Sequence, residues 1–149
     1  MIDIRHVYQT FGDRHILKDV SLSIKEGETM VILGASGSGK STILKLIIGL
    51  LRPTSGKVLV NGKDMGQLNE EELNEERRSM GMVFQYSALF DSLNVKENVA
   101  FGLRMHTRLS EEKIDAIVKE KLHLVGLDGI EDLMPANLSG GMKKRVRLA

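Results

Sequence analysis

A glycine-rich stretch, Gly34-Ala-Ser-Gly-Ser-Gly-Lys40-Ser41, constrains this chain more than any other feature, because it fits the pattern G-x-x-x-x-G-K-[ST] at every fixed position. The apolar run Thr29-Met-Val-Ile-Leu33 precedes it, and the mostly apolar segment 41–50 follows it. We therefore expect a buried strand over 29–33, a loop, and a buried helix over 41–50 that breaks at 52–56. This order predicts an α/β fold with a partly parallel sheet.

Each part of the motif has a role in holding a phosphate. Gly34, Gly37 and Gly39 allow the backbone to curl so that successive N–H groups point inward, and the positive end of the following helix favours an anion. Lys40 supplies a point charge between the β- and γ-phosphates, which gives it a catalytic role, and Ser41 supplies a hydroxyl to Mg²⁺. The residues expected to contact the nucleotide here are Gly34, Ser36, Gly37, Ser38, Gly39, Lys40, Ser41 and Thr42.

The motif alone does not separate ATPases, GTPases and small-molecule kinases, and a flexible Gly/Ser loop is the plain alternative. The flanking strand-like and helix-like runs argue against that alternative. Asn61-Gly-Lys-Asp64 superficially resembles the guanine-reading N-K-x-D, but the order is wrong and it follows the loop too soon. Because Asn-Gly favours a type I′ turn, a hairpin explains this segment better, and GTP is not expected.

The remaining pattern predicts further elements of both kinds. We expect strands over 2–8 and 20–24, a short buried strand over 81–85, and a polar, solvated helix over 70–79. A helix capped by Ser110 should carry one apolar face, made by Ile114, Ile117, Val118, Leu122 and Val125. The segment 138–149 begins a helix with no stop signal, so we expect the sequence to be a piece of a longer protein.

Composition narrows the function classes. Lys+Arg 21 against Asp+Glu 20 gives no global attraction to nucleic acid, and the absence of cysteine excludes disulfides and thiolate metal sites. The glutamates of 70–76 suit a solvated helix better than a metal site, and the histidines lack metal-type spacing. These histidines are His6, His15, His106 and His123. With no secretory signal and no apolar run near 20 residues, a cytosolic protein is the default.

Three further segments, in this order, resemble the ATP-hydrolysing subunits of ABC transporters. They are Phe11-Gly12, Gly81-Met-Val-Phe-Gln85 and Leu138-Ser-Gly-Gly-Met142. The resemblance implies that Phe11 stacks on adenine, with Tyr8 as a competitor for which core packing is favoured. It implies that Gln85 is catalytic, meets Mg²⁺ and the attacking water, and touches the membrane subunit. It also implies that Ser139, Gly140 and Gly141 face the ATP bound by a second copy.

The resemblance implies a truncated P-loop NTPase fold of the ABC ATPase type. An N-terminal antiparallel β subdomain and the Walker A core would occupy residues 1–84, and the Q-loop, helical subdomain and signature helix would occupy 85–149. The Walker B strand and the switch histidine would lie beyond residue 149. We therefore expect the 149-residue piece to bind nucleotide at most and not to hydrolyse it, and we expect apolar side chains beside the missing strand to be exposed.

A finer resemblance points to lipid transport. Leu89-Phe-Asp-Ser-Leu93 and Met142-Lys-Lys-Arg145 look like the toluene-tolerance or Mla-type ATPases, which work with a permease and an MCE-type substrate-binding subunit. This implies a peripheral protein on the cytoplasmic face of the bacterial inner membrane. Amino-acid or lipoprotein ABC transporters, or a soluble ABC ATPase acting on DNA or ribosomes, stay open. So do two roles for Lys143, Lys144, Arg145 and Arg147, which could meet an anion or form a solvated face.

Overall fold

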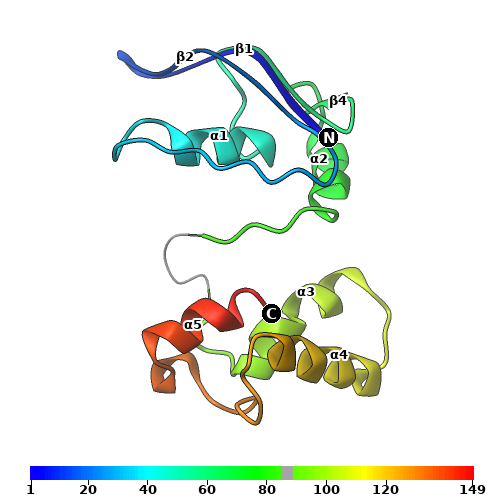
Figure 1. Cartoon of the computed structure of the whole chain (residues 1–149). Coiled ribbons are helices and arrows are strands. Elements are labelled where there is room, and N and C mark those ends of the chain that lie inside the picture. The colour runs from blue at the N-terminus through cyan, green and yellow to red at the C-terminus, as the bar shows by residue number, and fades with distance from the viewer. Residues whose placement is uncertain (85–88) are drawn as a thin grey trace. The chain divides into compact units, whose positions relative to one another are not determined.

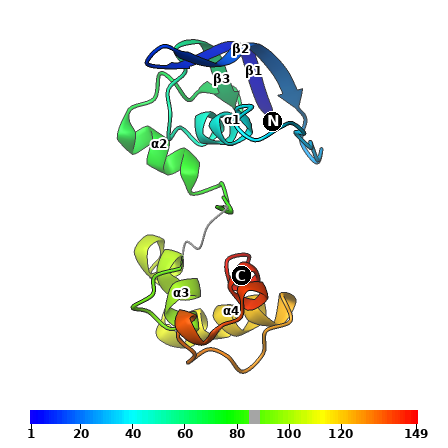
Figure 2. The ribbon, with the colours of Figure 1, turned by 90° about the vertical axis from the view of Figure 1, so that its left-hand side faces the viewer.

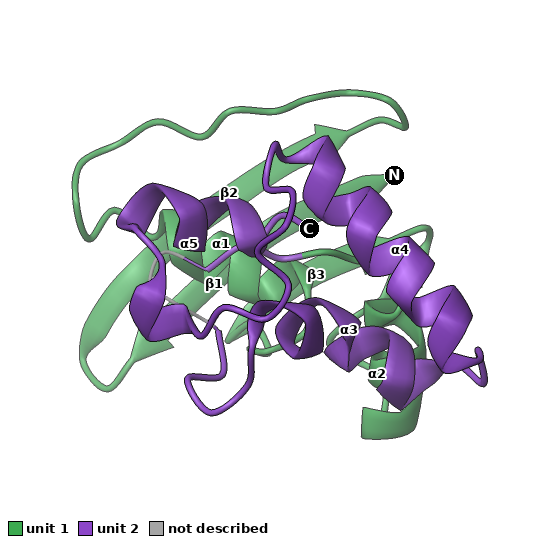
Figure 3. Ribbon diagram, turned by 90° about the horizontal axis from the view of Figure 1, so that it is seen from below, with its two compact units in different colours: residues 1–81 green, residues 82–149 purple. Residues whose placement is uncertain are grey.

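The computed structural model describes residues 1–84 and 89–149, so Gln85 lies outside the described residues. The chain forms two compact units, Met1–Gly81 and Met82–Ala149, and each is described by itself (Figure 3). The sequence predicted a boundary between residues 84 and 85, which is a few residues after the boundary between these two units.

The first unit is built on an antiparallel sheet in the order β2-β1-β3-β4 (Figures 1 and 2). Its strands are β1 (Ile2–Phe11), β2 (Arg14–Ile24), β3 (Ser55–Val60) and β4 (Lys63–Asp64). Asn61 and Gly62 join β3 to β4 with φ of 50° and 83°. Two consecutive positive φ values are what a type I′ turn requires, so the predicted hairpin is confirmed.

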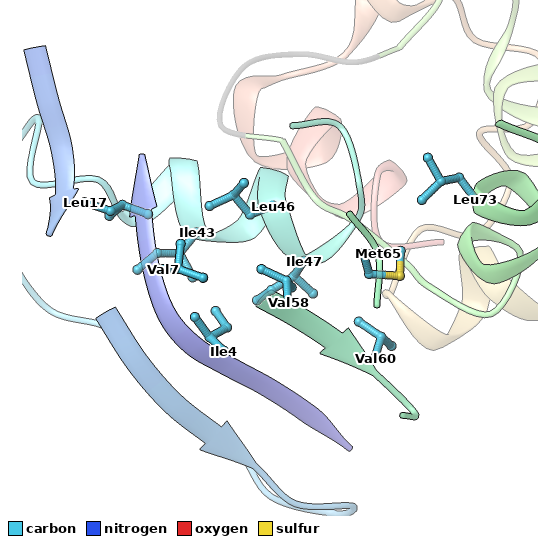
Figure 4. Packing of buried hydrophobic residues seen from close by; sticks show 10 residues of the cluster. All are labelled: Ile4, Val7, Leu17, Ile43, Leu46, Ile47, Val58, Val60, Met65 and Leu73. Carbon is cyan, nitrogen blue, oxygen red and sulfur yellow. The ribbon is translucent and has the colours of Figure 1, made fainter. Parts of the chain in front are cut away.

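One helix, α1 (Lys40–Ile47), covers a face of this sheet (Figures 1 and 2). Its Ile43, Leu46 and Ile47 are buried, whereas Leu44 is about half exposed, so the helix is buried on one face and not all round as predicted. It also ends before the predicted break at 52–56, because Gly49 adopts φ 68° and terminates it. The core of this unit, drawn in Figure 4, contains Ile4, Val7, Leu17, Ile43, Leu46, Ile47, Val58, Val60, Met65 and Leu73.

Both short strands predicted from apolar runs are wrong. Residues 29–33 form no strand, and Val31 and Leu33 are 72% and 88% exposed. Residues 81–84 form none either, and Val83 and Phe84 are also exposed. A parallel strand buried on both faces needs a hydrogen-bonded neighbour, and the strands of residues 1–84 and 89–149 pair only with one another, all antiparallel.

Helix α2 (Glu70–Arg77) is the polar helix that the sequence predicts. Asn69 accepts a hydrogen bond from the Glu72 N–H, and the Glu72 side chain accepts one from the Asn69 N–H, which forms a capping box. Leu73 is its one buried residue and belongs to the core of the first unit. Lys63 at the hairpin pairs with Glu76, and this hydrogen bond raises the pKa of Lys63.

The second unit is helical. It contains α3 (Val95–His106), α4 (Glu111–Leu124), the short 3₁₀ turn η1 (Pro135–Asn137) and α5 (Gly140–Val146). Ser110 occupies the N-cap position of α4, but its side chain makes no capping hydrogen bond. Of the predicted apolar face, Ile114, Val118 and Leu122 are buried, and Ile117 and Val125 are half-buried. The core of this unit contains Val95, Ala100, Ile114, Val118, Leu122, Leu127, Leu138 and Val146.

Two ion pairs join α3 to the α4 segment. The Lys96 ammonium lies 2.7 Å from an Asp115 carboxylate oxygen, and Arg104 binds both oxygens of Glu111. The hydrogen bond from Arg104 holds the pKa of Glu111 below its ordinary value. Within residues 1–84 and 89–149, every helix is too short or too polar to cross a membrane.

Candidate functional site: the phosphate loop and the signature segment

The phosphate loop depends on glycine at two positions for its shape. Gly37 and Gly39 adopt φ of 80° and 93°, in the left-handed region that other residues rarely enter. A Cβ at Gly39 would also lie 2.6 Å from Leu17 Cδ2, so the loop packs against β2 at a point where an added side chain would force Leu17 to move. A Cβ at Gly37 would meet nothing within 4 Å, so that glycine is required for conformation alone.

Lys40 closes the loop on itself. Its ammonium donates hydrogen bonds to the carbonyl oxygens of Gly34 (2.8 Å) and Ala35 (2.7 Å). A Cβ at Gly34 would lie 2.7 Å from Ser38 Oγ, so the first and fifth motif residues are in close contact. Ser36, Ser38 and Ser41 are exposed and Thr42 is half-buried, which leaves three hydroxyls accessible to a ligand.

The amino-terminal end of α1 lacks the side chains that bind or balance the first-turn N–H groups of the other helices. Its N-cap residue is Gly39, no side chain caps it, and its first turn contains no acid. Helices α2, α3 and α5 are capped by the side chains of Asn69, Asn94 and Ser139, and α4 has two glutamates in its first turn. Among the α-helices of the described residues, α1 alone has neither device. Its first-turn N–H groups therefore suit an external anion.

The aromatic residues named from the sequence both lie on β1. Phe11 is the last residue of the strand, pairs with Arg14 across the turn to β2, and has an exposed ring. The same hairpin carries Leu17, which contacts the loop at Gly39. Tyr8 is 41% exposed, so the core packing favoured for it is wrong. The pairing of β1 with β2 changes register on both sides of Val7. Because of this, the alternation of residues along β1 does not predict which side chains are buried.

The signature segment begins α5 in the second unit. Ser139 is the N-cap residue and accepts a hydrogen bond from the Met142 N–H at 3.2 Å, as the sequence predicts. Gly140 and Gly141 follow, and a Cβ on either would have no contact closer than 4.0 Å. Neither adopts a positive φ. Their lack of a side chain therefore has no cause within the described chain.

The four basic side chains of α5 are not equivalent. Arg145 donates to the carbonyl oxygens of Val125 (3.1 Å) and Gly126 (2.9 Å) at the end of α4, and Arg147 donates to that of Phe84 (2.9 Å). Two of the four, Arg145 and Arg147, therefore bind carbonyl oxygens of their own unit. Neither of the two roles considered from the sequence, anion binding or a solvated face, describes these two arginines. Lys144 is exposed, and Lys143 is half-buried.

The family model of the ABC transporter matches residues 17–149, which is most of the chain. The chain belongs to the ABC transporter family. The match includes the phosphate loop and the signature segment, so these features of the two units belong to one conserved domain type.

Curated relatives match the whole chain. A chloroplastic Arabidopsis thaliana protein named TRIGALACTOSYLDIACYLGLYCEROL 3 is 50% identical over 150 residues, which are 100% of this chain and 43% of that protein. A probable ribonucleotide transport ATP-binding protein, mkl, of Mycobacterium leprae is 48% identical over 99% of this chain and 43% of its own length. The intermembrane phospholipid transport system ATP-binding protein MlaF of Haemophilus influenzae is 46% identical, covering 100% and 56%. The chain thus spans about half the length of these relatives.

A solved ABC cassette, MJ0796, confirms the fold. Its dimeric structure matches with a TM-score of 0.92 and 37% identity, covering 99% of this chain and 67% of that one. A dimeric post-hydrolysis state of the same cassette, bound to ADP and Pi, matches with a TM-score of 0.91. The ABC ATPase fold predicted from the sequence, with an antiparallel β subdomain and helices, is therefore confirmed.

Met142, the last residue of the signature segment 138–142, is half-buried and packs against the core of the second unit, so its side chain has an apolar role. Within the described residues no group of three or more His, Asp or Glu side chains could hold a metal ion. The candidate Mg²⁺ ligand that can be located is Ser41, which is exposed at the start of α1.

A cleft of about 260 Å³ in the second unit is a feature that the sequence reasoning missed. Phe84, Phe90 and Phe101 line it and are all more than 40% exposed, and the rings of Phe90 and Phe101 lie 4.7 Å apart between centroids. Asn98 and Arg147 also line it. Phe90 lies in an irregular segment and Phe101 lies on α3. No single periodic pattern in the sequence therefore predicts that the two rings meet.

Proposed function

We propose that this chain is the nucleotide-binding part of an ATPase subunit that couples ATP binding and hydrolysis to transport. The amino-terminal end of α1 carries this proposal. It has no side-chain cap and no acid in its first turn, it follows a glycine loop of the required shape, and it carries Lys40. Such a helix end attracts an anion through both its free N–H groups and its dipole.

Each loop residue has a role in this proposal. Lys40 exchanges the carbonyl oxygens of Gly34 and Ala35 for the β- and γ-phosphate oxygens of ATP, and Ser41 offers its hydroxyl to Mg²⁺. Phe11, exposed at the tip of the β1–β2 hairpin, stacks on adenine. Gln85 would add a contact to Mg²⁺ and to the attacking water, and it lies outside the described residues.

A second copy of the chain explains the two glycines of the signature segment. Each glycine inside a helix costs about 1 kcal/mol relative to alanine, and neither Gly140 nor Gly141 has a steric reason in its own chain. A phosphate brought close to this backbone by another copy would supply one. The MJ0796 cassette, 37% identical, is dimeric, which supports an arrangement with ATP held between two subunits.

The aromatic cleft of the second unit is the proposed docking site for a helical segment of an integral membrane subunit. Three exposed phenylalanines around one cleft form an apolar surface of the kind that marks a protein contact. Phe84 precedes Gln85 directly, so the nucleotide-sensing glutamine and the cleft are adjacent in sequence. MlaF is named as the ATP-binding protein of a transport system, a wording that implies further subunits.

The proposed cargo is phospholipid. MlaF, 46% identical over the whole chain, is named for intermembrane phospholipid transport, and the plant relative, 50% identical, is named after a glycolipid. Such a subunit would work on the cytoplasmic face of a bacterial inner membrane with a permease and an MCE-type subunit. The mycobacterial relative mkl is named for ribonucleotide transport, which makes that cargo the second candidate.

The test uses the intact natural protein purified with its membrane subunit. Lys40→Ala should abolish Mg-ATP binding and turnover, because two charged hydrogen bonds worth about 1.5–3 kcal/mol each are lost. Lys113→Ala, which removes an exposed lysine of α4, should leave both unchanged. Reconstituted vesicles should move a labelled phospholipid, and movement of a ribonucleotide alone would show that the cargo is wrong. Equal turnover in Lys40→Ala, or purification with nucleic acid and no membrane protein, would contradict the proposal.

A further inference from the structure

Phe90 is held in place by its backbone and not by burial. Its side chain is 48% exposed, and Phe101, its ring partner, is 42% exposed, so little apolar packing fixes either ring. Phe101 is anchored by its position on α3. Phe90 lies in an irregular segment, where the Leu93 N–H donates to the Phe90 carbonyl oxygen at 3.1 Å to close a turn. Something outside this turn must hold it against α3.

The Asn98 amide provides that connection. Its Oδ1 accepts a hydrogen bond from the Phe90 N–H (2.7 Å), while its Nδ2 donates to the Phe90 carbonyl oxygen (3.1 Å). The same Nδ2 lies 2.9 Å from the carbonyl oxygens of Leu93 and Asn94. One side chain therefore binds both main-chain groups of Phe90, and its two amide hydrogens are shared among three carbonyl oxygens, those of Phe90, Leu93 and Asn94.

Asn98 is itself fixed by the start of α3. Asn94 accepts a hydrogen bond from the Glu97 N–H, and the Glu97 carboxylate accepts one from the Asn94 N–H, forming a capping box. This box sets the first turn of the helix, and Asn98 follows immediately. The amide that holds Phe90 thus projects from a rigid base, which is what a preformed contact surface requires.

We propose that Asn98 is a positioning residue that presets Phe90 beside Phe101 and so prepares the cleft to receive the membrane subunit. This inference rests on the docking site proposed above. Only an amide meets the requirement, since it must accept from one N–H and donate to carbonyl oxygens at once. Aspartate at 98 keeps the acceptor but places a carboxylate against three carbonyl oxygens, and leucine keeps the volume and loses every hydrogen bond.

The first experiment measures hydrogen exchange in the intact natural protein. Asn98→Leu and Asn98→Asp should speed exchange at the Phe90 and Leu93 amides, because the turn loses its connection to α3. The matched control is Val118→Ala, which destabilises the same core without lining the cleft. It should raise exchange across the unit without singling out this turn. Unchanged exchange at Phe90 in both Asn98 variants would overturn the inference.

The second experiment measures affinity for the membrane subunit in detergent. Asn98→Leu should weaken binding about tenfold, as loss of a strong interface residue does, and Val118→Ala of equal melting temperature should not. In a Phe90→Ala background, Asn98→Leu should have no further effect on binding while still lowering the melting temperature. Additive effects on binding would overturn the positioning role. Equal binding by wild type and Phe101→Ala would instead overturn the docking site, and the inference with it.

Discussion

Helix α1 of the first unit and helix α4 of the second end in the same way. Each is followed by a glycine in the left-handed region, Gly49 with φ 68° and Gly126 with φ 66°. In each, an arginine from another helix donates to the last carbonyl oxygens. Arg77 binds those of residues 48 and 49 at 2.9 and 2.8 Å, and Arg145 binds those of residues 125 and 126 at 3.1 and 2.9 Å.

Their amino-terminal ends differ. Helix α4 begins with Glu111 and Glu112 in its first turn, so its own side chains balance the dipole. Helix α1 begins with neither acid nor side-chain cap. The two helices end in the same way, so this difference is confined to their amino-terminal ends. The first unit thus has a helix start with neither cap nor acid, which is what the proposed phosphate site requires, while the start of α4 is balanced by its own glutamates.

The largest effect should come from a substitution that closes the open helix start. Gly39→Ala forces a positive φ on alanine and places its Cβ 2.6 Å from Leu17 Cδ2. We expect a loss of about 3 kcal/mol of stability and no measurable Mg-nucleotide binding. Calorimetry and urea unfolding check both. Gly37→Ala, which adds strain and no clash, is the matched control and should lose less stability. If Gly39→Ala binds normally, the loop geometry is not what holds the nucleotide.

A smaller effect should come from removing either arginine cap. Arg77→Ala and Arg145→Ala each leave two carbonyl oxygens without their partner, at a cost of about 1–2 kcal/mol measured by urea unfolding. The units should differ in ligand binding. Arg77→Ala should also weaken Mg-ADP binding, since α1 is only 8 residues long and loosening one end disturbs the other. If Arg145→Ala weakened Mg-ADP binding and Arg77→Ala did not, the proposed difference between the two units would be contradicted.

The smallest effect should come from the Arg104–Glu111 pair at the start of α4. The arginine lowers the pKa of Glu111, so the pair stabilises the folded protein above the ordinary glutamate value of about 4.3 and stops doing so as the pH falls below it. Wild type should thus lose slightly more melting temperature than Glu111→Gln between pH 6 and pH 3. Parallel curves for the two proteins would show that this exposed pair adds nothing.

Local chemistry made some of this predictable from the sequence. The Asn61-Gly62 hairpin, the Ser139 cap and the apolar face of α4 each depend on residues within one turn or one helix, and all three are confirmed. The strand predicted over 29–33 failed because pairing requires a neighbour that residues 1–84 and 89–149 do not supply. Tyr8 failed because register shifts in β1 change which residues face the core.

The aromatic cleft could not be predicted from the sequence, for a related reason. The two hydrogen bonds between Asn98 and Phe90, one in each direction, join residues eight apart and depend on a turn whose geometry no spacing rule gives. The two arginine caps likewise join residues 19 to 29 apart in the chain. Sequence patterns therefore identified the glycine loop and its lysine, but not these hydrogen bonds between residues far apart in the chain.

Hydrogen exchange on adding Mg-ATP to the intact natural protein tests the central claim most directly. If the start of α1 is the phosphate site, the amides of residues 37–42 should gain the most protection, and the capped starts of α2 and α3 should gain none. Protection that is absent from residues 37–42, or that is strongest at the capped helix starts, would contradict the account.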